Sequence, residues 1–224
     1  MTITLGFDIY GTLIDTQGVL TKLAEYTGQS ADFSRIWREK QLEYTFRRGL
    51  MRRYENFAVC TRNALDYTDS LLNTSLDEAA KQSLMDEYRV LPAFEDVPQS
   101  LKISKDAGFR LFGFSNGLAS AVQGLLDNAG ISEYFEGVVS VDEVQTFKPN
   151  PDVYHHFIKT TGAEPENAWL VSSNPFDVMG AINAGMKAAW LQRSHNVVFD
   201  PWGIEPTISI KSLAELPELL WGQV

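Results

Sequence analysis

The sequence predicts an α/β fold in which a parallel sheet with helices on both faces is interrupted by an inserted helical bundle. Residues Thr2–Phe7 form a short apolar run that is typical of a buried strand. From about Gln17 to Tyr88 the apolar residues recur at helical spacing instead. After Pro92, strand-like and helix-like segments alternate, and this alternation indicates a parallel sheet covered on both faces.

The segments after Pro92 are bounded by clear stop signals. The expected strands are Arg110–Phe114, Gly137–Val141, Ala168–Val171, Lys187–Leu191 and Thr207–Ile210. The expected helices run from Asn116 to near Gly130, from Pro151 to Thr161 and from about Pro175 to Ala184. Gly162 and Gly185 follow the last two helices, where glycine commonly ends a helix.

The helical block is predicted to be a domain inserted after the first strand. Breakers at Gly28-Gln29-Ser30 and a capping box from Ser75 to Glu78 divide it into three to five helices. We therefore expect a core domain of residues 1–15 and 91–224, and a helical domain of residues 16–90.

The chain of 224 residues is acidic, with 19 Lys and Arg against 29 Asp and Glu and a formal net charge of −10. This balance disfavours a nucleic-acid partner, which needs a basic patch. The nearest such run, Arg47, Arg48, Arg52 and Arg53, is typical of a solvated helix face.

The single cysteine, Cys60, allows no internal disulfide and is expected to be a small apolar residue. With no signal peptide and no apolar stretch near the about 18 residues of a membrane helix, we expect a cytoplasmic protein without membrane contact.

Four segments should meet at one edge of the sheet. Ligands of parallel α/β sheets bind at the carboxyl ends of the strands, near the point where the strand order reverses. Three segments directly follow predicted strands there, and a fourth residue lies in the loop after another strand. These are Asp8–Thr12, Ser115-Asn116 and Ser172–Asp177, with Lys148 as the fourth.

Each of these segments has a structural interpretation and a chemical one. Asp8 either caps a turn or is a nucleophile, since a positioned and partly desolvated carboxylate can attack carbon or phosphorus. Lys148 is either a surface residue or a cation that keeps Asp8 ionised. Ser115 and Asn116 either cap a helix or offer its N-terminal amides to an anion. Asp177 either stabilises a first helical turn or positions water.

The order and spacing of these segments resemble the four motifs of the haloacid dehalogenase superfamily. The matching stretches are Asp8-Ile9-Tyr10-Gly11-Thr12-Leu13, Ser115-Asn116-Gly117, Lys148-Pro149, and Ser172 to Asp177 with Gly180-Ala181 and Ala184-Gly185-Met186. The inserted stretch Trp37-Arg38-Glu39-Lys40-Gln41-Leu42-Glu43-Tyr44 is similar to a segment of the L-2-haloacid dehalogenases. The resemblance covers nearly the whole chain and implies a Rossmann-like core domain with a helical cap domain.

Two positions differ from the magnesium-dependent phosphatases of that superfamily. Tyr10 stands where those enzymes carry an Asp that protonates the leaving group, and Ser173 stands where they usually carry a magnesium ligand. A halide is a weak base and needs no general acid. Asp8 and Asp177 beside Lys148 would form a poor magnesium site. The resemblance therefore implies a metal-independent dehalogenase without a cofactor.

The resemblance implies a two-step reaction that converts a small L-2-halocarboxylic acid into a D-2-hydroxy acid and halide. Asp8 attacks the halogen-bearing carbon to form an ester, Arg38 takes up the halide, and water then hydrolyses the ester. The resemblance also implies that Thr12 fixes Asp8 and that Lys148, supported by Tyr154, stabilises the Asp8 carboxylate. Ser115 and the amides at Asn116 are implied to hold the substrate carboxylate. Ser172, Asn174 and Asp177 are implied to position and activate water. The implied apolar pocket consists of Tyr10, Leu42, Phe57, Asn174 and Phe176.

Two residues depart from the dehalogenase pattern. Glu39 stands where Gln is usual and would repel an anionic substrate if it faced the pocket, and Phe176 stands where Trp is usual and shortens one wall. Both bear on substrate size and efficiency. The family also implies a homodimer. Two alternatives remain: a phosphatase-like hydrolase that uses a phosphoaspartate, and a non-catalytic relative that only binds small carboxylates.

Overall fold

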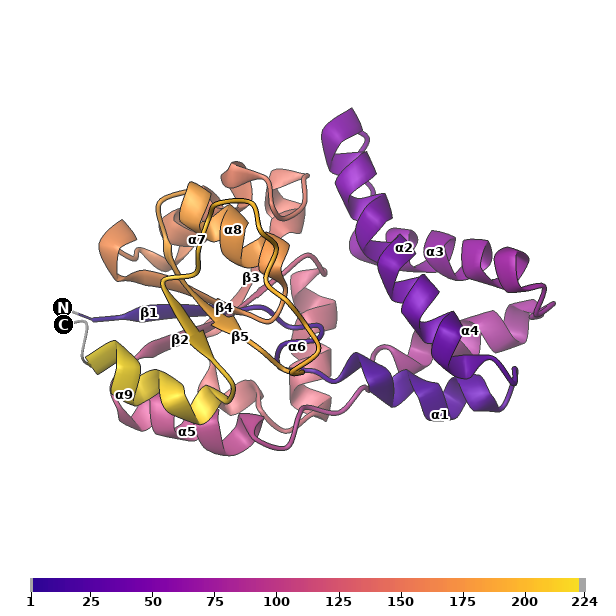
Figure 1. Ribbon diagram of the computed structural model, residues 1–224, viewed down its shortest axis with the longest axis horizontal. Helices are drawn as coiled ribbons and strands as arrows, with labels where there is room; N and C mark the ends of the chain where they lie inside the picture. The colour runs from indigo at the N-terminus through magenta and orange to yellow at the C-terminus, as the bar shows by residue number, and fades with distance from the viewer. Residues whose placement is uncertain (1, 222–224) are drawn as a thin grey trace.

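The computed structural model describes residues 2–221, and its six strands form one parallel sheet (Figure 1). The strands are β1 (Thr4–Phe7), β2 (Arg110–Ser115), β3 (Gly137–Ser140), β4 (Ala168–Ser172), β5 (Lys187–Leu191) and β6 (Ile208–Ile210). Their order in the sheet is β3-β2-β1-β4-β5-β6. The chain thus adds strands first on one side of β1 and then on the other, so the strand order reverses at β1. The predicted parallel α/β fold is confirmed.

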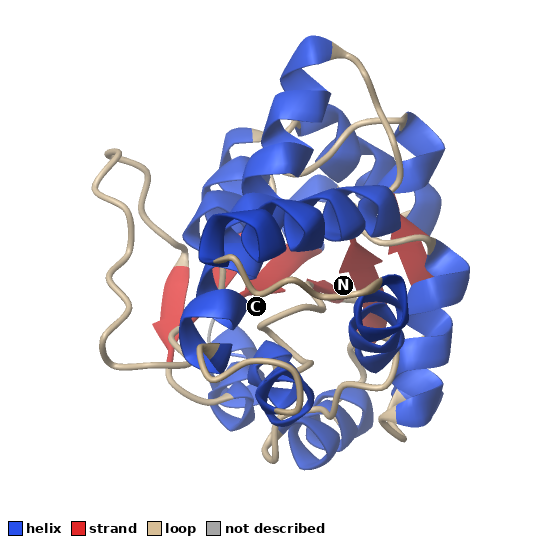
Figure 2. Cartoon of the chain, turned by 90° about the vertical axis from the view of Figure 1, so that its right-hand side faces the viewer, coloured by secondary structure: helices blue, strands red, loops and turns tan. Residues whose placement is uncertain are grey.

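Two layers of helices cover the sheet. The helices after the inserted block are α5 (Val97–Asp106), α6 (Ala119–Asn128), α7 (Pro151–Thr161), α8 (Pro175–Asn183) and α9 (Leu216–Trp221). Leu101 of α5, Leu125 of α6 and Leu216 of α9 belong to one buried cluster, whereas Phe157 of α7 and Val178 of α8 belong to another. The strands are enclosed between these two layers, as Figure 2 shows.

The register of the central strand sets the height of the loops at its end. Phe7, the last residue of β1, pairs with Gly113 of β2 and with Val171 of β4. All four residues of β1 are buried, which fits a strand covered on both faces. Asp8 therefore stands one residue beyond this level, beside Phe114 and Ser172.

The inserted block consists of helices that lie beyond the carboxyl end of β1 (Figure 1). Within residues 19–87 these helices are α1 (Val19–Ala24), α2 (Ser30–Met51), α3 (Phe57–Leu72) and α4 (Glu78–Glu87). Their buried residues Leu23, Trp37 and Leu84 join the same apolar cluster as Leu13 and Leu101 of the sheet region. The expected three to five helices are confirmed, whereas the domain boundaries at residues 15 and 91 stay a prediction. No helix within residues 2–221 is both long enough and apolar enough to span a membrane.

Two expected helix starts are wrong. Ser75 does not cap α4, because it has a left-handed backbone, with φ of 56°, and Asp77 accepts the Ala80 N–H at 2.8 Å instead. The helix expected from Asn116 begins at Ala119, after a turn. Helices α5 and α9 have no counterpart in the sequence prediction. Pro98 in the first turn and the polar residues around its short apolar stripe obscure α5.

Gly180 lies where α8 passes closest to the residues around Lys148. A Cβ at this position would lie 2.7 Å from Pro149 Cβ and 2.8 Å from Tyr154 Cε2. Both distances are shorter than a van der Waals contact between carbon atoms. The absence of a side chain at Gly180 therefore lets α8 approach the segment that carries Lys148.

We expect Gly180→Ala to lower the free energy of unfolding by about 1–3 kcal/mol, because overpacking outweighs the higher helix propensity of alanine. Urea denaturation measures this change. Gly124→Ala in α6 is the matched control, because a Cβ there meets nothing within 4 Å. The control should gain up to about 1 kcal/mol, and a similar gain for Gly180→Ala would contradict the packing account.

Candidate active site

Asp8 follows β1 and is held by four side chains from three segments. The residue is 8% exposed. Its Oδ2 accepts hydrogen bonds from Thr12 Oγ1 at 2.9 Å, Asn174 Nδ2 at 2.7 Å and Ser172 Oγ at 3.3 Å. Its Oδ1 lies 3.3 Å from Lys148 Nζ. The two carboxylate oxygens therefore differ, because three neutral donors converge on Oδ2 whereas Oδ1 faces the ammonium group.

Lys148 is a buried lysine between two carboxylates, so its interpretation as a surface residue is wrong. It is 1% exposed, and its Nζ donates to Asp177 Oδ2 at 2.8 Å and to the Phe114 carbonyl at 2.9 Å, besides its contact with Asp8. Its backbone N–H donates to Asn116 Oδ1 at 3.0 Å. Three acceptors thus match the three hydrogens of the ammonium group, and the buried charge is compensated.

Asp177, in the first turn of α8, points into the site and is fully buried. Its Oδ1 accepts a hydrogen bond from the Tyr154 hydroxyl at 2.8 Å, and its Oδ2 pairs with Lys148. Burial raises the pKa of Asp177 to about 6, with Lys148 acting against this shift and the nearby Asp8 adding to it. The Tyr154 hydroxyl contacts Asp177 rather than Lys148. Any support that Tyr154 gives to Lys148 therefore acts through Asp177.

Ser115 and Asn116 form a turn before α6 rather than its first residues. Ser115 Oγ accepts the Gly117 N–H at 3.0 Å, and Ser140 Oγ donates to the Gly117 carbonyl at 2.7 Å. Since the helix begins at Ala119, the expectation that Asn116 opens it is wrong. Both residues are nonetheless buried, and Asn116 accepts the backbone N–H of Lys148.

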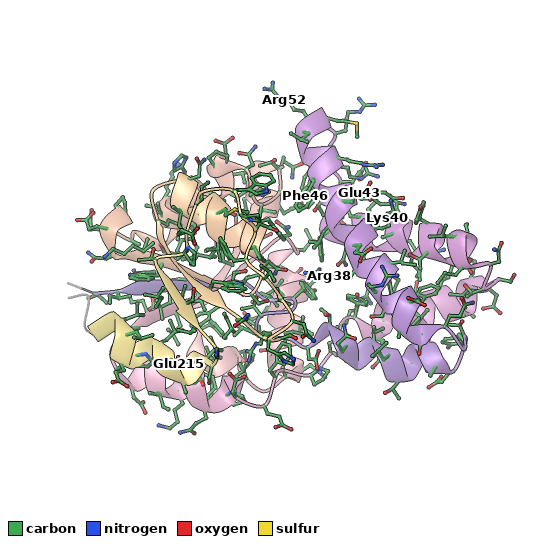
Figure 3. The ribbon with its side chains drawn as sticks, in the orientation of Figure 1. Arg38, Lys40, Glu43, Phe46, Arg52 and Glu215 are labelled. Atoms are coloured by element: carbon green, nitrogen blue, oxygen red, sulfur yellow. The ribbon has the colours of Figure 1, made fainter. Side chains whose placement is uncertain are left out.

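Arg38 comes from the inserted block and reaches the loop after β1. It lies on the side of α2 that faces the sheet region (Figure 3). Its Nη2 donates to the Tyr10 carbonyl at 3.2 Å, and its Nη1 donates to Gln41 Oε1 at 2.6 Å. Gln41 is fully buried and donates in turn to Thr61 Oγ1 at 2.6 Å. Within residues 2–221, Arg38 makes no ion pair, so its positive charge is held beside Tyr10 by neutral acceptors.

Aromatic rings line the seam between the inserted helices and the sheet region. The Tyr10 ring lies 5.5 Å from the Phe57 ring of α3, and the Phe176 ring lies 5.0 Å from the Phe46 ring of α2, measured between centroids. Burial raises the pKa of Tyr10 to about 12, so its hydroxyl stays protonated at neutral pH. Leu42 is half-buried on α2, one turn after Arg38. Of the expected pocket residues, Tyr10 and Phe57 therefore contact each other at this seam, and Phe176 contacts Phe46 of α2.

Two residues that could have interfered with the site do not. Glu39 pairs with Arg35 at 3.1 Å, and its side chain is 61% exposed, so its carboxylate points to solvent rather than toward an anionic substrate. The Cys60 thiol is buried, and burial raises its pKa to about 11. A thiolate nucleophile is therefore disfavoured at neutral pH.

A divalent metal ion does not fit these residues. Among residues 2–221 no group of three or more His, Cys, Asp or Glu side chains could hold one. The Lys148 ammonium already lies against both Asp8 and Asp177. Ser173, which stands at the usual position of a magnesium ligand, donates its hydroxyl to the Gly11 carbonyl at 2.6 Å. The donor set favours a cationic side chain over magnesium at this place.

Sequence reasoning missed two positioning residues. Gln41 orients Arg38, and its signal was its place in the stretch that resembles the dehalogenases. Arg193, just after β5, donates from Nε at 3.0 Å and Nη2 at 2.7 Å to the Thr12 carbonyl, and pairs with Asp96 at 2.7 Å. Its place at the carboxyl end of a strand could have identified it.

One cavity lies away from Asp8. Its volume is about 830 Å³, and it lies between the end of α2 and the segment 144–152 rather than at Asp8. We assign the chemistry to Asp8 because hydrogen bonds from three loops converge there, and cavity size carries no such information.

Comparisons with known proteins agree with this geometry. A family model described as haloacid dehalogenase-like hydrolase matches residues 4–185. The chain is 39% identical over 215 residues to an (S)-2-haloacid dehalogenase from Pseudomonas putida, covering 96% of this chain and 94% of that protein. It is 35% identical over 217 residues to haloacetate dehalogenase H-2 from Moraxella sp. (strain B), covering 96% of each.

A solved structure matches the whole fold. It is the L-2-haloacid dehalogenase from Xanthobacter autotrophicus with chloropropionic acid covalently bound, which is 32% identical, with a TM-score of 0.94 and coverage of 100% of both chains. The fold and the site define a hydrolase with a buried aspartate at the reversal point of a parallel sheet. The chain belongs to the haloacid dehalogenase-like hydrolases.

We expect Lys148→Met to lower the free energy of unfolding by about 3–5 kcal/mol at pH 7.5, because two buried carboxylates lose their cation. The loss should be smaller at pH 5. Asp177, whose pKa is already raised to about 6, then takes up a proton in the folded state, so its contribution to stability is largest at low pH and is lost as the pH rises through 6.

Urea denaturation at both pH values measures this effect. The double variant Lys148→Met/Asp177→Asn should recover part of the stability at pH 7.5, because it removes one of the unpaired charges. A loss that is equal at pH 5 and pH 7.5, with no recovery in the double variant, would show that the charges are not its cause.

Proposed function

We propose that the protein is an (S)-2-haloacid dehalogenase in which Asp8 is the nucleophile toward a small L-2-halocarboxylic acid. The observation that carries this proposal is the pairing of a buried, hydrogen-bonded carboxylate with Arg38, a guanidinium that neutral acceptors hold. A carboxylate positioned in this way can displace a halide, and an unneutralised cation can solvate the departing charge. The similarity to (S)-2-haloacid dehalogenases over 96% of the chain supports the same reaction.

In the first step an Asp8 oxygen displaces the halide from carbon 2 with inversion. The oxygen–carbon bond forms while the carbon–halogen bond breaks, and the halide leaves with the electron pair toward Arg38. We assign the attack to Oδ1, because three donors already hold Oδ2. Ser115 and Asn116 bind the substrate carboxylate, and Tyr10, Leu42, Phe57, Asn174 and Phe176 enclose its alkyl group.

In the second step water attacks the carbonyl carbon of the Asp8 ester, with Asp177, Ser172 and Asn174 positioning and activating it. The Asp8 Oδ2 then carries the developing negative charge, and the hydroxyl and amide groups that surround it in the structure are placed to stabilise this oxyanion. The carbon 2 oxygen leaves as an alkoxide and takes up one proton from water. The other proton is released as Asp8 returns to its ionised form.

The phosphatase-like alternative is weaker on the observed donor set. It needs a general acid two residues after Asp8 and a magnesium ion beside Asp177. Tyr10, with a pKa of about 12, is a poor proton donor at neutral pH, and Lys148 lies where the metal would bind. A non-catalytic relative that only binds small carboxylates would not need Thr12, Ser172 and Asn174 directed at one oxygen of Asp8.

Three further features belong to this proposal. Residues 16–90 are the cap domain over the core domain of residues 1–15 and 91–224. The protein works as a cytoplasmic homodimer, which the family resemblance and the single cysteine support. Exposed apolar side chains at the end of α2, Leu50 at 86% and Met51 at 62%, are candidates for a subunit contact. Size-exclusion chromatography with light scattering tests the dimer.

The direct test is halide release from L-2-chloropropionate, with and without EDTA. We expect the same rate in both, and a loss of at least about 10⁴-fold in Asp8→Asn, because an amide cannot form the ester. A generic aryl phosphate with magnesium is the counter-substrate and should release no phosphate. Magnesium-dependent phosphate release, or no halide from chloro-, bromo- and fluoro-acids alike, would overturn the proposal.

Gln41→Leu should lower kcat by about 10- to 100-fold, because Arg38 loses the acceptor that orients it toward the leaving halide. KM should change less, and the inhibition constant for added halide should rise. Gln123→Leu in α6 removes only an exposed hydrogen bond to Asp127 and is the matched control. Unchanged halide inhibition in Gln41→Leu would contradict the orienting role.

A further inference from the structure

The cavity at the end of α2 joins the inserted helices to the sheet region away from Asp8. One wall consists of residues 48–55 and the other of residues 144–152, and the volume of this open cavity is about 830 Å³. Arg52, which lines the cavity, lies at the tip of α2, whereas Arg38 lies about half-way along the same helix (Figure 3). The contact between Phe46 and Phe176 lies between these two places along α2. The cavity is therefore separate from the site at Asp8.

Its wall from α2 and the residues that follow carries three arginines that no carboxylate neutralises. Arg48, Arg52 and Arg53 line the cavity, and within residues 2–221 none of them forms an ion pair. Among the described residues Arg38 also lacks an ion pair, but other arginines of the inserted block have acidic partners: Arg47 pairs with Glu43, Arg35 with Asp32 and Glu39, and Arg62 with Asp66 and Glu78. In a chain with a net charge of −10, a local excess of positive charge attracts anions.

The arginines are set in place by the fold. Arg48 Nη2 donates to Asn63 Oδ1 at 2.9 Å, which holds its guanidinium. Arg52 ends α2 in the left-handed conformation, with φ of 53°, a position that glycine or asparagine usually occupies. This conformation places the Arg52 side chain at the tip of α2, where it lines the cavity.

The opposite wall supplies neutral hydrogen-bonding groups. Gln145, Thr146 and Asn150 line it. Two acidic residues also line the cavity, Asp152 on this wall and Glu55 on the other, and neither pairs with an arginine among the described residues. Three positive charges thus exceed two negative ones. Guanidinium groups bind carboxylate and phosphate oxygens in a bidentate manner, so the ligand chemistry that fits best is a small anion with two or more oxyanion groups.

The wall of residues 144–152 contains Lys148 in its sequence. A Cβ at Gly49 would lie 3.4 Å from Thr146 Oγ1, and the Tyr54 ring lies 4.9 Å from the Phe147 ring, so the wall of residues 48–55 packs against the residues just before Lys148. We propose that this cavity is an anion-binding site, distinct from the Asp8 site, in which a polyanion joins Arg48, Arg52 and Arg53 to the segment 145–150. Its occupant holds the inserted helices against the sheet region.

Calorimetric titration of the full chain at low ionic strength tests this site, with inorganic pyrophosphate and citrate as separate probes. We expect saturable binding of at least one probe at one site per chain. Arg52→Gln/Arg53→Gln should weaken it about tenfold or more, a loss of about 1.4 kcal/mol per tenfold. Arg35→Gln is the matched control, since Arg35 lies on α2 but pairs with Glu39. The affinity of this variant for the probe should change by less than about twofold.

Each outcome decides the proposal. Tighter binding of pyrophosphate identifies a phosphate-bearing ligand, and tighter binding of citrate identifies a polycarboxylate. No saturable binding of either probe, an unchanged affinity in the double variant, or an equal loss in Arg35→Gln would overturn the site. Since the readout is binding rather than halide release, its failure is distinguishable from a failure of the proposed dehalogenase reaction.

Discussion

The ion pairs of Lys148 with Asp8 and Asp177 are the interaction on which the site depends. Two carboxylates buried this closely repel each other, and each loses much of its hydration. The ammonium group between them, at 3.3 and 2.8 Å, allows both to be present in the folded chain. The close approach of α8 at Gly180 and the hydrogen bond from the Lys148 backbone N–H to Asn116 Oδ1 both serve this arrangement. Stability and reactivity therefore share the same three side chains.

The inserted helices supply what the sheet alone cannot. The sheet loops present a nucleophile and donors for its Oδ2, which would suit attack on phosphorus as well as on carbon. Arg38 adds a positive charge next to the loop after β1. The guanidinium is held there by a hydrogen bond to Gln41, whose side chain donates in turn to Thr61. A halide leaving group needs solvation of its charge rather than a proton, so this cation and the neutral Tyr10 favour carbon–halogen cleavage.

The sequence could predict those parts of the structure that local pattern determines. The apolar run before Asp8 and the alternation after Pro92 were sufficient for the parallel sheet and for the convergence of its loops. Local pattern alone left the burial of Lys148 open, because a lysine before proline has no feature that distinguishes the surface from the interior; only the family resemblance implied its place beside Asp8. Ser75 failed as a cap because Asp77, two residues on, accepts the same kind of hydrogen bond. Arg193 stands far from Asp8 in the chain, and only the folded sheet brings it to the Thr12 carbonyl.

The central claim is that Asp8 itself becomes esterified and is hydrolysed at its own carbonyl carbon. The most direct measurement is mass spectrometry of the Asp8 peptide after multiple turnovers in water enriched in heavy oxygen. The account predicts heavy oxygen in the Asp8 carboxylate, and a hydroxy acid that carries ordinary oxygen when a single turnover is measured. An unlabelled Asp8 together with heavy oxygen in the product of the first turnover would show direct attack by water on carbon 2, and would contradict the account.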